Sequence, residues 1–161
     1  MTSALRIRAA AAADVPTLLE LIAELAAYER RAHHMHASEA LLARHLFGER
    51  PSAEALLAEV EGQPTGYAVF FETFSTFAGR PGIWLEDLFV RPARRRAGIG
   101  RALLVRVAAD ATARGCAHLE WSALDWNEPA LSFYRSLGAQ ARAEWIPHRI
   151  EGADLQRLAA G

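Results

Sequence analysis

Two neighbouring carboxylates, Glu86 and Asp87, lie near the start of Leu85–Leu104 (LEDLFVRPARRRAGIGRALL). This segment has the highest concentration of side chains that could bind or react. A carboxylate can accept a proton from an amine, and it attracts cations. Side chains alternate between the two faces of a regular strand, which groups Glu86 with Leu88 and Val90. We therefore expect one of the two carboxylates to face a site and the other to face away, and the sequence leaves open which.

Arginines and glycines follow at once, with the spacing Arg95-x-x-Gly98-x-Gly100 between an expected strand and an expected helix. The first N–H groups of a helix have no partner inside it and carry partial positive charge. Glycines let an anion approach the main chain, and arginine pairs with phosphate in a bidentate manner. The segment predicts a diphosphate site, but on these residues alone a solvated arginine face is an equal alternative.

A third chemical group is Tyr134, which follows Phe133 on a short expected helix, 129–137. The two rings point to different sides of the helix, so one can pack while the phenol reaches a cleft. A phenol with a pKa of about 10 is protonated at neutral pH and can donate a proton. From spacing alone, an amphipathic tyrosine between helix and sheet is the more ordinary interpretation.

Hydrophobic periodicity predicts the elements that must position these groups. We expect strands at 4–10, within 55–74 (two, with a turn at 61–64), at 82–90 and at 117–124; helices after Asp14, from Ser38 to Phe47, at 98–114 and at 129–137; and two strands with a final helical turn in 140–158. The order is strand, two helices, three strands, helix, strand, helix, two strands. It predicts an α/β fold with a mixed, mostly antiparallel central sheet flanked by helices, in one domain, 1–161.

Composition excludes several classes of protein. The chain of 161 residues is 52% apolar and 23% charged with a formal net charge of −1, so it is globular and has no overall field for nucleic acid. All 18 basic residues are arginine, which excludes chemistry that needs a lysine. The single Cys116 and the lack of a long apolar run predict a cytoplasmic protein with no membrane partner. The His33–His36 run (HHMH) lacks the spacing of a metal site, so we expect none.

Two segments together resemble motifs of the GNAT superfamily of N-acetyltransferases: LFVRPARRRAGIG its motif A, and DWNEPALSFYRSLGA its motif B. With LIAELAAYER, HLFGER and LEDLFV, they resemble the spermidine/spermine (diamine) N-acetyltransferase branch. The resemblance implies a GNAT fold, with acetyl-CoA as co-substrate. It also implies transfer of acetyl to a primary amine of a small molecule by direct attack in a ternary complex.

The resemblance also implies roles for particular residues. Glu86 would accept the amine proton through a water, Tyr134 would protonate the leaving thiolate, and an N–H near Leu88, where the strand bulges or splays, would hold the oxyanion. The residues implied for coenzyme binding are Leu88, Phe89, Val90, Arg95, Arg96, Ala97, Gly98, Ile99, Gly100, Arg101, Asn127, Pro129, Ala130 and Arg135. Those implied for the amine are Tyr28, Glu29, Glu86, Glu120, Trp121 and Ser122.

One departure bears on the substrate. Polyamine-acetylating members of the branch have Asp-Pro-Trp before LED, whereas Ser75-Thr76-Phe77 has no carboxylate and resembles the subgroup that acetylates thialysine-like amines. A small primary amine, such as a lysine analogue or short diamine, is therefore favoured over spermine. The resemblance further implies a homodimer. The alternatives are a non-catalytic acyl-CoA-binding regulator, an enzyme for a protein or peptide amine, and a nucleic-acid or protein-docking module that uses Arg91–Arg96.

Overall fold

The computed structural model describes residues 4–161, which form two compact units: the first ends at Ser122 and the second is Ala123–Gly161. Each unit is described separately. The elements of the first are β1 (Leu5–Ala9), α1 (Val15–Tyr28), α2 (Glu39–Phe47), β2 (Glu54–Val60), β3 (Gln63–Ser75), β4 (Arg80–Val90), α3 (Ile99–Ala113) and β5 (Leu119–Glu120). The second contains α4 (Glu128–Ser136) and α5 (Gly152–Ala159).

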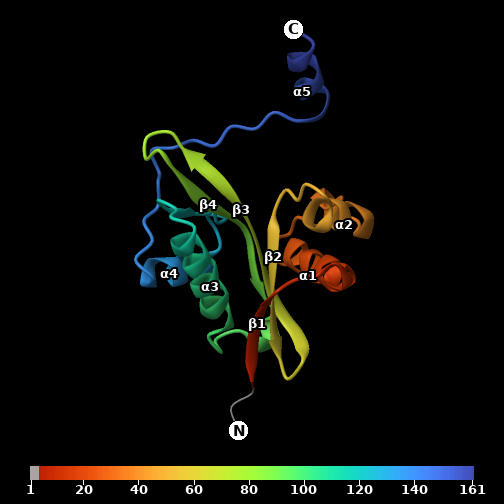
Figure 1. The fold of residues 1–161 in the computed structure, drawn as a ribbon, viewed down its shortest axis with the longest axis vertical. Coiled ribbons are helices and arrows are strands. Elements are labelled where there is room, and N and C mark those ends of the chain that lie inside the picture. The colour runs from red at the N-terminus through yellow and green to blue at the C-terminus, as the bar shows by residue number, and fades with distance from the viewer. Residues whose placement is uncertain (1–3) are drawn as a thin grey trace. The chain divides into compact units, whose positions relative to one another are not determined.

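The first unit is built on a five-stranded sheet in the order β1-β2-β3-β4-β5 (Figure 1). The first four strands pair antiparallel with their neighbours, and β5 joins β4 in parallel through two residue pairs, Ile83 with Leu119 and Trp84 with Glu120. The predicted α/β class with a mixed, mostly antiparallel sheet is confirmed. The parallel β5 needs a crossover connection, and α3 supplies it.

The β2–β3 hairpin turns at Glu61 and Gly62, where the sequence predicted the turn. Both residues have positive φ, 54° and 75°, as a two-residue hairpin of matching twist requires. Ser38 caps α2, as predicted, by accepting a hydrogen bond from the N–H of Leu41. Gly115, with φ of 71°, ends α3 in the left-handed conformation, also as predicted.

Helices cover both faces of the sheet in the first unit: α1 and α2 lie on one face and α3 lies on the other (Figure 1). On the α1 face a core cluster joins Leu18 and Leu21 of α1 to Tyr67, Val69 and Phe89 of β3 and β4. On the opposite face α3 buries Ile99, Leu103, Leu104, Val107 and Ala111. These two cores hold β4 from both sides, and β4 is the strand that carries the two carboxylates.

Four expectations differ from the structure. The strand expected at 117–124 covers only Leu119–Glu120. The two strands predicted in the tail are absent: residues 139–151 contain no strand, and Pro147, which has no N–H, interrupts the segment. The final helical turn is the longer helix α5. Asp14 stands at the N-cap position of α1 but does not cap it with its side chain, because its carboxylate accepts from the Ala11 N–H and pairs with Arg8 at 2.7 Å.

Helices in the described part of the chain are all too short or too polar to cross a bilayer.

Candidate active site

A β-bulge interrupts β4 at Glu86. Leu85 pairs with Phe70 of β3 and Asp87 pairs with Val69, so Glu86 is an extra residue between two adjacent pairs. The resemblance implied a bulge or splay near Leu88, and the bulge lies two residues earlier. Bulges re-aim side chains and increase the local twist, and they are common beside active sites.

The bulge places both carboxylates on the face of the sheet that α1 covers. Before it, Trp84 pairs with Phe71; after it, Asp87 pairs with Val69, and Phe71 and Val69 lie on the same side of β3. The expectation that only one carboxylate faces the site is therefore wrong, because an extra residue shifts the alternation by one. Beyond the bulge, Phe89 shares this face and Leu88 has moved to the other.

Asp87 is held by a phenol in the core. The Tyr67 hydroxyl donates to Asp87 Oδ2 at 2.9 Å, and Tyr67 itself is fully buried. Burial raises the pKa of Asp87 to about 6; the charges of Glu86 and Glu29 act in the same direction, and the Tyr67 hydrogen bond opposes them. Burial also raises the pKa of Tyr67, so the phenol is a donor at neutral pH. The sequence did not single out this buried pair, because the bulge that creates it has no local signal.

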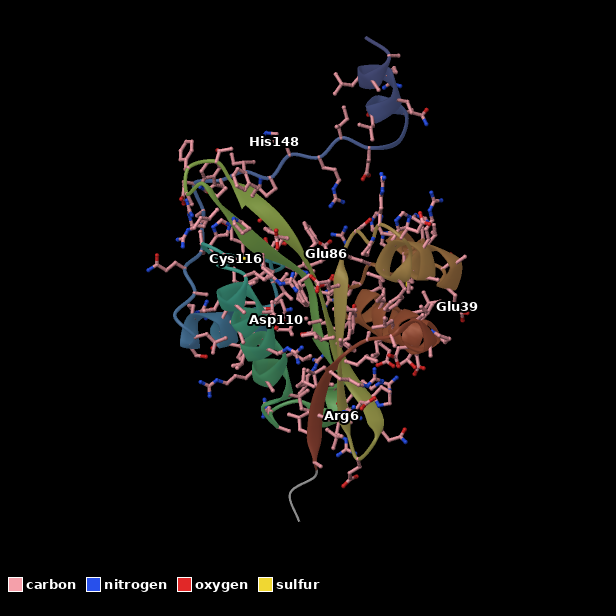
Figure 2. The ribbon with its side chains drawn as sticks, viewed as in Figure 1. Arg6, Glu39, Glu86, Asp110, Cys116 and His148 are labelled. Carbon is pink, nitrogen blue, oxygen red and sulfur yellow. The ribbon has the colours of Figure 1, made fainter. Side chains whose placement is uncertain are left out.

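Glu86 is exposed on the same face (Figure 2). Trp84, two residues earlier in β4, holds it by a hydrogen bond. The Trp84 indole N–H donates to Glu86 Oε2 at 2.8 Å. The side chain predicted to act as a base is thus fixed through one oxygen and open to solvent.

Tyr28 and Glu29, at the end of α1, lie in the same neighbourhood. Burial raises the pKa of Glu29, and Arg31 opposes this shift. Glu29 and Glu86 both contribute to the raised pKa of Asp87, so each of them is close enough to Asp87 for their charges to repel. Such a group favours the approach of a cation.

Arg95 connects this region to the predicted diphosphate site. Its guanidinium carbon lies 4.3 Å from the centre of the Tyr28 ring, and its Nε donates to the Val90 carbonyl at 2.9 Å. The side chain is therefore committed to an aromatic face and a strand carbonyl. Arg95 shapes the loop in addition to the coenzyme contact implied for it.

The loop ends where α3 begins, with a backbone that only glycine adopts easily. Gly98 is the N-cap of α3 with φ of 78°, and the first helical bond runs from the Ala102 N–H to the Gly98 carbonyl at 2.9 Å. The amides of Ile99, Gly100 and Arg101 have no carbonyl to bond within the helix. A β-carbon on Gly98 would meet no protein atom within 4 Å, so the space beside it is open.

The arginines of the loop divide into two groups. Arg91 is structural: it pairs with Glu20 and Glu24 of α1 and donates to the Pro64 carbonyl at 3.0 Å. Arg94, Arg96 and Arg101 are exposed and form no ion pair with any other described residue. The predicted cradle therefore has open amides and three charges that no carboxylate in the described chain neutralises.

The second half of β4 also offers an edge for pairing. β5 pairs only with Ile83 and Trp84, so within the described residues no strand follows Leu88, Phe89 and Val90 on the side away from β3. The resemblance implied this splayed edge for the coenzyme arm. Glu120 stands opposite Trp84 and pairs with the His118 imidazole at 3.2 Å; Trp121 and Ser122 follow at the end of the unit.

In the second unit the predicted residues lie on and before α4. Asn127 occupies the N-cap position without a side-chain capping bond, and Pro129 lies in the first turn, with Ala130 next. The rings of Tyr134 and Phe133 are 5.5 Å apart between centres. Arg135 pairs with Glu128 of the same helix.

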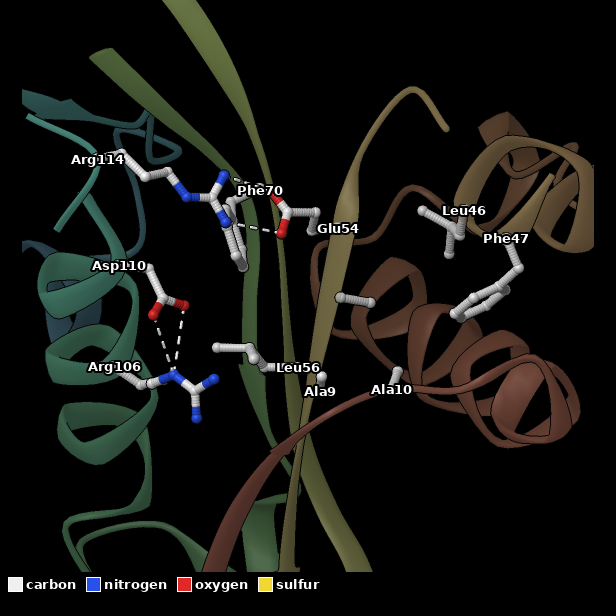
Figure 3. Close-up of a pocket in the computed structure, with 11 residues that line it drawn as sticks. Ala9, Ala10, Leu46, Phe47, Glu54, Leu56, Phe70, Arg106, Asp110 and Arg114 are labelled. Carbon is white, nitrogen blue, oxygen red and sulfur yellow. Dashed lines mark hydrogen bonds and ion pairs between the residues drawn. The ribbon is translucent and has the colours of Figure 1, made fainter. Parts of the chain in front are cut away.

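A separate hollow of about 310 Å³ lies between α2, the strands and α3, and no predicted site residue lines it (Figure 3). Its charged residues are already paired, Arg106 with Asp110 and Arg114 with Glu54. We therefore place the candidate site at β4 and the start of α3. No group of three or more histidines, cysteines or carboxylates in the described chain could hold a metal ion.

Comparisons with known proteins decide the family. Residues 18–139 match the model of the acetyltransferase (GNAT) family. The chain belongs to this family. It is an N-acetyltransferase, and enzymes of the family use acetyl-CoA as co-substrate.

Relatives and solved structures agree with this assignment. The chain is 36% identical to thialysine N-epsilon-acetyltransferase of Mus musculus, with 96% of each chain covered. It is 30% identical to L-ornithine N5-acetyltransferase NATA1 of Arabidopsis thaliana, covering 95% of this chain and 87% of that one. An integron cassette protein from the mobile metagenome of V. cholerae has a similar structure, with a TM-score of 0.82, 28% identity and 98% of both chains covered.

Proposed function

We propose that this GNAT enzyme acetylates the primary amine of a small lysine-like molecule, using acetyl-CoA in a ternary complex. The observation that carries the proposal is the bulge in β4, which gathers Glu86 and Asp87 on one face with Glu29 nearby. A cationic amine fits such a face, and the relatives with 36–38% identity are named for thialysine.

The coenzyme end of the site is assigned to the start of α3 and the edge of β4. The diphosphate would lie against the amides of Ile99–Arg101, with the exposed Arg96 and Arg101 nearby. Gly98 leaves the space that such an anion needs. The pantetheine arm would run along Leu88–Val90. Coenzyme contacts are also proposed for Asn127, Pro129, Ala130 and Arg135.

Acetyl transfer requires three events, and the chain has a candidate for each. Glu86 takes the amine proton through a water, so that the nitrogen lone pair can attack the thioester carbon. A main-chain N–H near Leu88 stabilises the oxyanion that forms. Tyr134 donates its proton to the departing thiolate. Tyr28, Glu29, Glu120, Trp121 and Ser122 are proposed to hold the rest of the amine substrate.

A small amine is favoured over a polyamine because the tip of the β3–β4 hairpin, residues 75–79, has no carboxylate. Ser75 Oγ accepts from the Ala78 N–H at 3.1 Å, so its hydroxyl serves the turn. A spermine molecule has several charges to satisfy, and each missing anion lowers its affinity more than that of a substrate with one charge at that end.

The working form proposed is a cytoplasmic homodimer in which residues 1–161 act as one catalytic domain on small molecules, without nucleic acid or membrane. Large apolar side chains exposed in the second unit, Trp145, Ile146 and Leu158, support an association between copies. Light scattering tests this part, and a mass of one chain overturns it.

The function is tested by incubating the purified chain with acetyl-CoA and a panel of amines: thialysine, ornithine, lysine, a short diamine, spermidine, spermine and a lysine peptide. Release of the coenzyme thiol and the mass of the product are measured, with the single Cys116 as background. We expect the highest kcat/KM for a small lysine-like amine. A preference for the peptide or for spermine contradicts the substrate, and coenzyme binding without release on any amine indicates a regulator.

A further inference from the structure

The hydrogen bond between Trp84 and Glu86 joins a residue with no assigned role to the proposed base. The donor is the indole Nε1, 2.8 Å from Glu86 Oε2. An indole N–H can only donate, so this bond is strongest when the carboxylate is ionised and accepts. The contact therefore favours the form of Glu86 that can take up a proton.

Trp84 is well placed to hold a fixed position. It is half-buried in the only stretch of β4 that is paired on both edges, with Phe71 of β3 on one side and Glu120 of β5 on the other. From the next residue onward β5 no longer pairs with β4, and Glu86 is the bulged residue itself. Trp84 thus lies in the regularly paired part of β4, and its side chain hydrogen-bonds to Glu86 in the bulge.

Glu86 lies in an acidic neighbourhood, in which its charge and that of Glu29 both act on the buried Asp87–Tyr67 pair. The titratable and charged groups on this face are Tyr28 and Glu29 with Arg31 and Arg95 beside α1, Tyr67 of β3, Asp87 of β4, and His118 and Glu120 at β5.

We propose that Trp84 is a positioning residue, whose indole N–H fixes one oxygen of Glu86 and leaves the other to accept the proton of the amine. The inference rests on the proposed role of Glu86. It explains how an exposed carboxylate at an irregular point of a strand is kept in one orientation beside Asp87.

The kinetic test is Trp84→Phe, which keeps an aromatic ring and removes the donor. We expect the acid limb of the kcat–pH profile to move up by about one unit, which lowers kcat about tenfold on that limb. At alkaline pH the rates should converge, and KM for acetyl-CoA should not change. Trp126→Phe, the same change at an exposed tryptophan, is the control and should keep the wild-type profile. An equal loss of kcat at every pH would indicate a merely structural role and overturn the proposal.

A second measurement does not depend on turnover. The indole resonance of Trp84, identified in an ¹⁵N spectrum by its loss in Trp84→Phe, should shift with pH as the Glu86 carboxyl titrates. In Glu86→Gln that titration should disappear. A resonance with the same pH dependence in both proteins overturns the proposal, whatever the activity. Absence of thiol release in the wild type would contradict the proposed function alone, since the resonance still reports the contact.

Discussion

The two ends of the second half of β4 build binding surfaces in opposite ways. At the bulge, side chains dominate: Glu86 is held by an indole and Asp87 by a phenol. At the start of α3 the main chain dominates: Arg96 and Gly98 both have positive φ, 64° and 78°, and the amides beyond them lack helical partners. The first surface is acidic and suits an amine, while the second has partial positive charge and suits a diphosphate. The proposed amine site and the proposed diphosphate site therefore lie a few residues apart, at the two ends of this half of β4.

The largest expected effect comes from a residue outside both surfaces. Tyr134→Phe should lower kcat by about 100-fold or more, because removing a general acid leaves the thiolate to depart unaided. KM for acetyl-CoA and for the amine should change little, which would show that both surfaces of β4 remain intact. Steady-state kinetics measure this, and an unchanged kcat would remove Tyr134 as the acid.

The main-chain surface can be broken by a single methyl group. Gly98→Ala should weaken acetyl-CoA about 100-fold, because a β-carbon would occupy the space proposed for phosphate. Gly115→Ala is the matched control: it creates the same left-handed conflict, at φ of 71°, at the other end of α3. Both variants should lose about 1 kcal/mol of stability, but only the first should lose coenzyme affinity by calorimetry. Equal affinity in the two variants would contradict the cradle.

The side-chain surface should affect the pH dependence of the protein's stability. The pKa of Asp87 in the folded protein is about 6, against 3.8 for the free side chain, so the folded state binds more protons between these values. Stability from this group is therefore present at low pH and is lost as pH rises from about 4 to 6. At 1.36 kcal/mol per unit, reduced for partial exposure, the loss is about 2 kcal/mol. Asp87→Asn should remove that part of the dependence in denaturant unfolding at pH 4.5 and 7.5; an unchanged dependence assigns it to other groups.

The smallest effect is expected at Ser38, the N-cap of α2. A change there should lower stability without changing either binding surface. Ser38→Ala should cost about 1 kcal/mol, since the Leu41 N–H loses its acceptor at the start of α2. Neither KM should move. A change in amine KM here would mean that the acidic surface depends on α2, and the contrast between the two surfaces would have to be redrawn.

The sequence was sufficient to predict most of the fold and the residues of the main-chain surface. Periodicity located the helices, Ser38 and Gly115 marked ends, and Gly98 appeared where a left-handed residue was needed. Such a glycine can be recognised in a sequence because a left-handed backbone position favours that residue type.

The geometry around Glu86 and Asp87 could not be predicted in the same way. A bulge between Leu85 and Asp87 contains neither glycine nor proline, so strict alternation assigned the carboxylates to opposite faces. The contacts of Trp84 and Tyr67 depend on that bulge and were missed with it. Arg91 was included in the run Arg91–Arg96 of the alternative docking module, although its partners Glu20 and Glu24 lie some seventy residues earlier in the chain. Long-range pairing of this kind has no local signature.

The extra residue in β4 also makes the length of this strand matter more than its composition. Deleting Glu86 would bring the strand back into phase with β3, with Asp87 still opposite Val69 and Phe89 still opposite Tyr67. Phe89 would keep its place in the core, and only the pair of acids on one face would be lost. The hairpin tip at 76–79, by contrast, can gain or lose residues without altering any pairing, so this enzyme should tolerate insertions in its tip and none in the strand beside it.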